Sequence, residues 1–151
     1  MMGPPSWDPS TVDTFLSASF LSSSRQLVIP LSLPSISTVS SPVQALIDSG
    51  ASDSFLDTRF AKKHRLETTR LKVPRNLRLF DGGLAPSGPI THSIVLDILP
   101  PKGSVHSHPF LLSSLDPTTP IVLGIDWLAS LNPSINWEQS DIFFRASKVI
   151  P

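Results

Sequence analysis

The sequence predicts a mostly β fold, a closed barrel or closed sheet with one or two short helices, from three observations. Short apolar runs, alternating or continuous, recur along the chain as they do in half-buried or fully buried strands. Glycine and proline separate these runs, as is typical of turns. Only residues 57–64 and 125–131 have the apolar spacing of a helix. Many short strands with few helices indicate a barrel or closed sheet.

The apolar runs place strands, in chain order, at residues 27–33, 43–47, 54–56, 77–80, 90–98, 105–112, 121–123 and 142–144. Pro30 and Pro34 interrupt the first run, and because proline is confined to edges within sheets, this strand is expected at an edge. The run that ends at Phe80 is followed by Asp81-Gly82-Gly83, a strong signal for a tight turn.

Each of the two helical patterns has a start or a stop signal. Asp57 or Thr58 is expected to cap the first helix, which runs to about His64. The second helix is expected to end before Asn132-Pro133, because proline cannot continue a helix.

The chain of 151 residues fits one domain with a substantial core. Residues 1–24 are rich in serine and proline and are expected to form a flexible leader, because such a stretch buries too little apolar surface to offset its ordering entropy. The domain itself is expected at residues 25–146, followed by a C-terminal tail at residues 147–151.

Composition excludes several classes of protein. Acidic and basic residues balance at 12 each, so no net field attracts the chain to nucleic acid or a membrane surface. The longest apolar runs are too short to span a bilayer, and no basic segment precedes the apolar residues near the N-terminus, so an intracellular, non-secreted protein is expected. The absence of cysteine excludes disulfides, a thiol nucleophile and thiolate metal sites.

The chemistry is concentrated in Asp48-Ser49-Gly50-Ala51-Ser52, directly after an apolar strand. An aspartic protease needs a carboxylate on a tight loop at a strand end, followed by a hydroxyl that supports the loop. It then needs a glycine, which permits a sharp turn and the close approach of a partner carboxylate. A small residue and a second hydroxyl complete the crowded loop. The five residues meet these requirements in order.

The sequence contains this motif once, and neither Asp-Ser-Gly nor Asp-Thr-Gly occurs elsewhere in the chain. Two carboxylates at about 3 Å share one proton, so that one acts as base and the other as acid. A single copy cannot supply such a pair. The motif therefore predicts a symmetric homodimer in which Asp48 meets its own mate across a two-fold axis.

Three segments resemble the retropepsin family, and most closely the proteases of Ty3/gypsy-type retrotransposons and genes domesticated from them. These segments are residues 45–57, residues 80–83 and residues 121–137, the last including Asn132-Pro133 and Trp137. The resemblance covers roughly residues 25–146. It implies a closed β-barrel subunit that works as a homodimer, cleaves polypeptides and needs neither metal nor cofactor. It also suggests an association with intracellular particles.

The resemblance also implies a role for individual residues. Asp48 is implied to be catalytic, with loop support from Ser49, Gly50, Ala51 and Ser52. The residues implied to lie on a flap that closes over the peptide are Asp81, Gly82, Gly83 and Leu84. The apolar strand paired with the active-site loop is implied to include Ile121 and Leu123, with Gly124 after it. Serine at position 49, where threonine is commoner, keeps the hydroxyl but loses a methyl group.

Other candidate residues have simpler explanations. The acids Asp53, Asp57, Asp81 and Asp126 are expected to cap helices or turns. His106 and His108 would share one face of a strand, but no third zinc ligand is evident. No Gly-x-Ser-x-Gly nucleophile elbow occurs for serine catalysis. The basic residues of segment 59–78 are expected to form a solvated helix-and-loop surface, so nucleic acid is not an expected partner.

Two alternatives to a peptidase remain open. The domain could be a domesticated, catalytically inactive module retained for dimerisation or protein binding, since the leader resembles no enzyme segment. It could also resemble the ubiquitin-pathway proteases with retropepsin-like domains, which use the same Asp-Ser-Gly-Ala sequence. The Trp127 and Trp137 segment argues against that second alternative.

Overall fold

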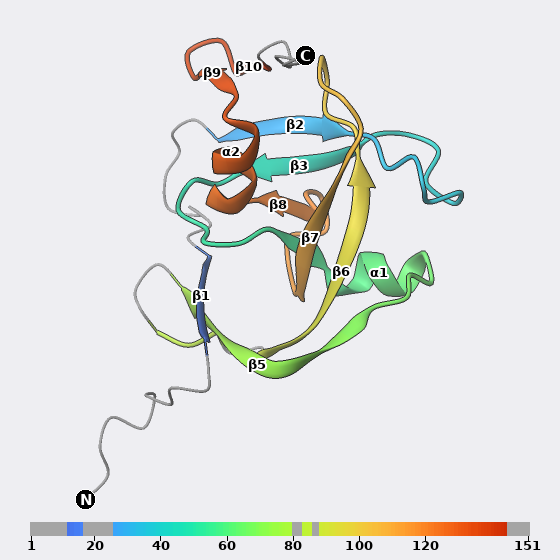
Figure 1. Cartoon of the computed structure of the whole chain (residues 1–151), viewed down its shortest axis with the longest axis vertical. Coiled ribbons are helices and arrows are strands. Elements are labelled where there is room, and N and C mark those ends of the chain that lie inside the picture. Colours follow the sequence, from blue (N-terminus) through green and yellow to red (C-terminus); the bar gives the residue numbers. More distant parts are fainter. Residues whose placement is uncertain (1–11, 17–25, 80–82, 86–87, 145–151) are drawn as a thin grey trace, which may run out of the picture.

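The computed structural model describes residues 12–16, 26–79, 83–85 and 88–144, and it is mostly β (Figure 1). Its strands are β1 (Val12–Leu16), β2 (Leu27–Leu31), β3 (Val43–Ile47), β4 (Phe55–Asp57), β5 (Thr69–Leu79), β6 (Ile90–Ile98), β7 (His106–Ser113), β8 (Ile121–Leu123), β9 (Ser134–Asn136) and β10 (Asp141–Phe143). Its helices are α1 (Thr58–Lys63) and α2 (Ile125–Leu131).

One curled sheet contains most of these strands, in the order β1-β5-β6-β7-β4-β8-β3-β2. The chain just after β2 returns to the end of β6, where Ser32 and Leu99 exchange backbone hydrogen bonds of 3.0 and 2.9 Å. This bridge closes the strands from β6 to β2 into a ring. The predicted mostly β, closed architecture is therefore confirmed, and β2 lies at the end of the strand order, as its prolines predicted.

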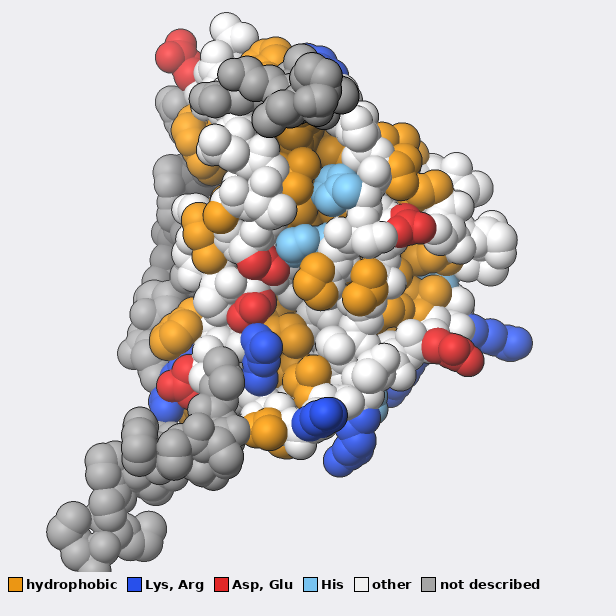
Figure 2. Space-filling view, in the orientation of Figure 1, with side chains coloured by type: hydrophobic (Ala, Val, Ile, Leu, Met, Phe, Trp, Pro, Cys, Tyr) orange, Lys and Arg blue, Asp and Glu red, His pale blue; other side chains and the backbone are white. Residues whose placement is uncertain are grey.

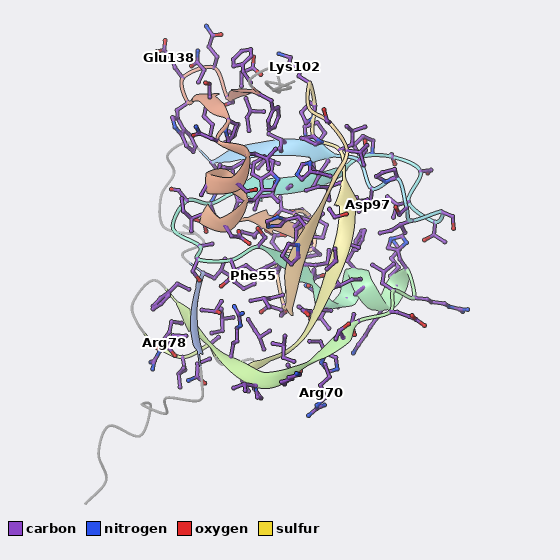
Figure 3. All side chains as sticks on the ribbon, viewed as in Figure 1. Phe55, Arg70, Arg78, Asp97, Lys102 and Glu138 are labelled. Atoms are coloured by element: carbon purple, nitrogen blue, oxygen red, sulfur yellow. The ribbon has the colours of Figure 1, made fainter. Side chains whose placement is uncertain are left out.

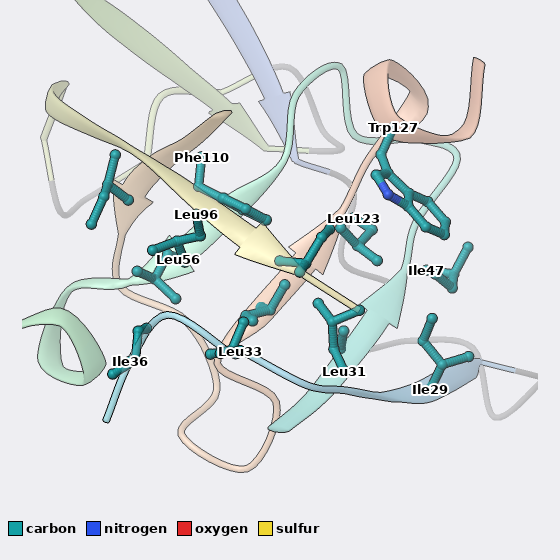
Figure 4. Close-up of a cluster of buried hydrophobic side chains, with 14 of the residues drawn as sticks. Ile29, Leu31, Leu33, Ile36, Ile47, Leu56, Leu96, Phe110, Leu123 and Trp127 are labelled. Atoms are coloured by element: carbon teal, nitrogen blue, oxygen red, sulfur yellow. The ribbon is translucent and has the colours of Figure 1, made fainter. Parts of the chain in front are cut away.

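The main hydrophobic core fills this ring (Figure 4). It includes Leu31, Leu56, Phe110, Leu123 and Trp127, each at most 1% exposed. Trp127 projects from α2 into this core, whereas Trp137 is 43% exposed.

A second apolar cluster lies on the opposite face of β4 and β8. Ile121 and Leu123 of β8 contribute to the main core, and Val122 between them contributes to the second cluster with Phe55 and Ala51. Both faces of these strands are therefore buried, which explains why they appear in the sequence as continuous apolar runs.

The structure extends two elements beyond the sequence prediction. β5 begins at Thr69, although only residues 77–80 were predicted as strand and the preceding basic segment was taken as a solvated helix-and-loop surface. Pro74 and a register shift between Arg70 and Arg75 obscure the alternating pattern. Val12–Leu16, expected within the flexible leader, form β1 in parallel with β5. The rest of the leader and tail residues 147–151 lie outside the described residues.

Helix α1 begins where predicted, but its cap differs. Asp57 occupies the N-cap position without a capping side-chain hydrogen bond, and its Oδ1 instead accepts a 3.0 Å bond from the backbone N–H of Leu115. Helix α2 ends at Leu131, as predicted, and its C-cap residue Asn132 adopts a left-handed conformation with φ of 46°.

Basic side chains gather along β5 and α1 at the lower part of the face in Figure 2, with acidic and apolar side chains among them. Among the described residues, no helix is both long and apolar enough to cross a membrane.

Candidate active site

The loop after β3 holds Asp48 at the end of a strand, as the sequence predicted. β3 pairs in parallel with β8, from Ala45 opposite Ile121 to Ile47 opposite Leu123. The pairing continues one residue further, because the Asp48 N–H donates to the carbonyl oxygen of Leu123 at 2.9 Å. The catalytic candidate is thus fixed to the central, doubly buried part of the sheet.

The Asp48 carboxylate turns back over its own loop. Its Oδ1 accepts a 2.9 Å hydrogen bond from the N–H of Gly50, and its backbone carbonyl accepts a 3.1 Å bond from the N–H of Ala51. The side chain is half-buried, its Oδ2 atom is fully buried, and Ser49 and Gly50 are exposed. An aspartate whose side chain accepts a hydrogen bond from the backbone N–H two residues later forms a tight turn of fixed geometry.

The start of α2 packs directly against this loop. The N–H of Ile125 donates to the carbonyl oxygen of Ala51 at 2.8 Å. A Cβ atom added at Gly124 would lie 2.2 Å from the carbonyl oxygen of Asp53 and 2.8 Å from that of Ala51. Glycine is required here for close backbone approach, since its φ of −93° is open to any residue. The predicted pairing of Ile121–Gly124 with the active-site loop is present.

The residues implied to form a flap follow β5, where the chain folds back on itself. Arg78 and Leu84 form an antiparallel bridge, and the N–H of Ala85 donates to the carbonyl oxygen of Leu77 at 2.8 Å. Gly83 and Leu84 are exposed. The other two residues assigned to the flap, Asp81 and Gly82, lie outside the described residues.

A family model described as the PEG10/RTL1 protease domain matches residues 44–150, which include the active-site loop, the hairpin and α2. The chain belongs to this family. PEG10/RTL1 protease domains are retropepsin-like and derive from Ty3/gypsy-type genes, so the resemblance inferred from the three sequence segments is confirmed.

A solved structure supports the fold assignment of this PEG10/RTL1-type domain. The retroviral protease-like domain of Ddi1 from Leishmania major aligns with a TM-score of 0.54 and 16% sequence identity, covering 80% of this chain and 90% of that one. At this identity the similarity shows the fold alone.

A buried polar network behind the active-site loop was not predicted. Ser54, which is 0% exposed, accepts a 3.1 Å hydrogen bond at Oγ from the N–H of Gly124 and donates a 2.8 Å bond to Asp126 Oδ1. His108 Nε2 lies 2.9 Å from Asp126 Oδ2 and 3.2 Å from Ser54 Oγ. The network joins the end of the loop, β7 and the first turn of α2, so it holds together the elements that position Asp48.

This network does not have the arrangement of a Ser-His-Asp triad. In a triad the carboxylate and the serine contact opposite nitrogens of the imidazole, whereas Asp126 and Ser54 both contact Nε2 of His108. The serine hydroxyl is also buried away from solvent. The residues therefore support the loop and do not form a second nucleophilic centre.

The histidines of β7 bond to helix α2. His106 Nε2 accepts a 3.0 Å bond from Trp127 Nε1, and His108 pairs with Asp126. No group of three or more metal-binding side chains occurs within the part of the chain that the structure describes. A cavity of about 490 Å³ is lined by residues from segments 58–68, 88–92 and 112–114, and Asp48 does not line it.

The pKa of Asp126 lies below its ordinary value. Burial by itself raises this pKa, but hydrogen bonds from His108 and Ser54, the charge of His108 and the N–H of Trp127 together outweigh burial. Folding therefore favours the ionised carboxylate. Its contribution to stability is fully present above the ordinary pKa of about 4 and is lost as the pH falls through the lower folded-state value.

We expect Asp126→Asn to lower stability near neutral pH and to flatten its acid dependence. As the pH falls from about 5 to about 3, thermal unfolding should show a smaller loss of stability for Asp126→Asn than for the parent, because the variant has no carboxylate to protonate at this site. Parallel curves for the two proteins would contradict the assignment.

Proposed function

We propose that this PEG10/RTL1-type domain is an aspartic endopeptidase that cleaves polypeptide substrates as a homodimer. One observation carries the proposal: Asp48 stands at the end of a buried strand with its carboxylate oriented by Gly50, on a loop locked to β8 and α2. A carboxylate held in one geometry by a rigid scaffold is what general acid–base catalysis requires.

The exposure of the loop supports the dimer. Ser49 and Gly50 lie at the surface, immediately beside the half-buried Asp48. A two-fold axis near these residues would bring each Asp48 to its mate without displacing the core. The interface would be isologous, because the same loop contributes from both copies.

The mechanism follows from the chemistry of paired carboxylates. With one proton shared between them, the ionised Asp48 removes a proton from a water molecule, which attacks the scissile carbonyl carbon. The protonated Asp48 of the second copy donates a hydrogen bond to the carbonyl oxygen, where negative charge develops. The proton taken from the water is then passed to the amide nitrogen, the C–N bond breaks, and the amine leaves. The titration that governs activity belongs to the pair, and mild acid keeps one proton on it.

Cleavage of a peptide library at about pH 5, measured over a series of protein concentrations, tests the proposal. Below the dissociation constant of the dimer, we expect the cleavage rate to rise with the square of the protein concentration, since each site needs two chains. Sedimentation of the same samples should show the dimer appearing in the same range.

Pepstatin, an inhibitor of aspartic peptidases, provides the control for the type of chemistry. Cleavage that is proportional to protein concentration and insensitive to pepstatin would indicate a contaminant and refute the proposal. A stable dimer that cleaves no peptide would favour the second candidate, a domesticated domain that binds protein partners through the same fold.

A further inference from the structure

Strand β1 lies between β5 and the active-site loop, with backbone hydrogen bonds on both sides. On one side it pairs in parallel with β5, from Val12 opposite Arg75 to Leu16 opposite Leu79. On the other side Phe15 uses both of its backbone groups: its N–H donates to Ser52 Oγ at 2.8 Å, and its carbonyl oxygen accepts from the Ser52 N–H at 2.9 Å. Figure 1 shows β1 running from β5 toward the loop that follows β3.

The side chains of β1 alternate between burial and exposure. Thr14 is 0% exposed and Leu16 is 8% exposed, whereas Phe15 between them is 45% exposed. Leu16 belongs to the second apolar cluster, which also contains Ala51 of the active-site loop and Leu77 of β5. The place that β1 occupies, between β5 and Ser52, thus buries an aliphatic side chain at one position of an extended segment and a hydroxyl-bearing side chain two residues earlier.

Thr14, the buried residue two positions before Leu16, makes polar contacts with the loop. The hydroxyl of Thr14 donates to Asp53 Oδ2 at 3.3 Å, and the hydroxyl of Ser52 donates to the same oxygen at 3.0 Å. Arg75 of β5 forms an ion pair with Asp53 at 3.3 Å. Asp53, held by Ser52 of the loop and Arg75 of β5, therefore presents a hydrogen-bond acceptor to the hydroxyl of Thr14.

An ion pair between Asp13 and Arg78 also joins β1 to β5. Asp13 Oδ2 lies 3.5 Å from Arg78 Nε, and Figure 3 shows Arg78 beside β1 on β5. The Asp13 side chain is 40% exposed, so this ion pair adds little to the affinity of the strand.

These contacts are those by which a protein binds an extended peptide. Main-chain hydrogen bonds supply affinity, and pockets for alternate side chains supply specificity. We propose that residues 12–16 occupy the groove in which a peptide substrate lies, so that the chain carries its own competitor for the active site. This inference rests on the proposed function, because it assigns a regulatory segment to the same site. The preferred external ligand is an extended peptide with a hydroxyl-bearing residue two positions before an aliphatic one.

The connection to the rest of the chain makes the competition effective. Only residues 17–26 separate β1 from β2 in the sequence. A segment on a short tether competes at an effective concentration on the order of millimolar. A peptide of moderate affinity binds only when β1 leaves, and a five-residue strand at the end of the sheet order can leave without opening the main core.

Two substitutions of Phe15 distinguish the effect of displacing β1 from the effect of removing the phenylalanine side chain. Phe15→Pro removes the N–H that donates to Ser52 Oγ, and Phe15→Ala keeps that N–H while removing the same exposed ring. Both are made in an Asp48→Asn background, so that binding is measured without cleavage. The probe is a fluorescent synthetic peptide with the sequence of residues 11–17.

We expect Phe15→Pro to bind this peptide about tenfold or more tightly than either Phe15→Ala or the Asp48→Asn parent, because its groove is vacated. Equal binding by all three proteins, or binding by none, would overturn the inference. Because binding is read independently of cleavage, a failure of the proposed peptidase activity leaves this result interpretable. Conversely, if the protein is an active peptidase and its variants bind the peptide equally, only the regulatory role of β1 is refuted.

A second measurement tests the inference even if the Phe15→Pro variant does not fold. The Asp48→Asn protein, with β1 unaltered, is titrated with the unlabelled peptide to millimolar concentration while its backbone amides are followed by NMR. We expect the Phe15 amide signal to move toward that of an unstructured residue as β1 is displaced. A Phe15 signal that stays unchanged up to millimolar peptide would overturn the inference.

Discussion

Asp48→Asn is expected to lower the rate of peptide cleavage by about 10³-fold, the size of effect that a positioned acid–base group supplies. An amide can neither share a proton with a second side chain nor remove one from water. The substitution removes the function from both halves of a dimer at once, because each copy contributes the same residue.

The fold should survive this substitution. Asparagine has the shape of aspartate, and its side-chain oxygen can still accept the hydrogen bond from the N–H of Gly50. Circular dichroism, thermal unfolding and sedimentation of the variant should therefore match those of the parent, so that the lost activity is attributed to chemistry.

Asp116→Asn is the matched control. Asp116 also accepts hydrogen bonds two residues ahead in its own turn, from the N–H and the hydroxyl of Thr118, but it is exposed and does not belong to the active-site loop. We expect parental cleavage from this variant. An Asp48→Asn protein that cleaves as fast as Asp116→Asn would exclude Asp48 as the catalytic carboxylate.

The sequence predicted those parts of the site whose structure depends on residues that are neighbours in the chain. β3 and β8 are buried on both faces, so each appears as an uninterrupted apolar run. The turn at Asp48 depends on bonds between neighbouring residues, and five consecutive residue types reveal it. Gly124 was placed correctly because a glycine between an apolar strand and a helix belongs to the same family pattern.

The parts that were missed depend on contacts between distant segments. Ser54 and Gly124 are 70 positions apart, and nothing near either residue indicates that the serine hydroxyl accepts the glycine N–H. The bonds from His106 and His108 to α2 were not predicted either, because their partners Trp127 and Asp126 lie 21 and 18 positions further along the chain. β1 was taken for a flexible leader because a short strand whose bonds go to β5 and Ser52 has no stronger local signal than its serine-rich surroundings.

Gly124→Ala is expected to destabilise the domain by about 3 kcal/mol or more, at the upper end of the cost of overpacking. The new methyl carbon would lie 2.2 Å from the carbonyl oxygen of Asp53 and 2.8 Å from its carbonyl carbon. Both are backbone atoms, so no side-chain rotation relieves the clash. The loop must move away from α2, which also strains the 2.8 Å hydrogen bond from Ile125 to Ala51.

Gly88→Ala is a control with the same chemical change and a different physical cost. A Cβ at Gly88 meets nothing within 4 Å, but the residue has φ of +88°, which side chains rarely adopt. Its cost should therefore be about 1–2 kcal/mol, from backbone strain alone. Denaturant unfolding of the two variants separates the causes.

Comparing Gly124→Ala with Gly88→Ala also links stability to activity. Gly124 packs against the loop that carries Asp48, whereas a Cβ at Gly88 would contact nothing within 4 Å. Under conditions where both variants remain folded, Gly124→Ala should lose most of its cleavage because a displaced loop misaligns the shared carboxylates. Gly88→Ala should retain it. A stable, fully active Gly124→Ala protein would show that the loop tolerates displacement from α2, and that the close packing of these two backbones does not position the catalytic residue.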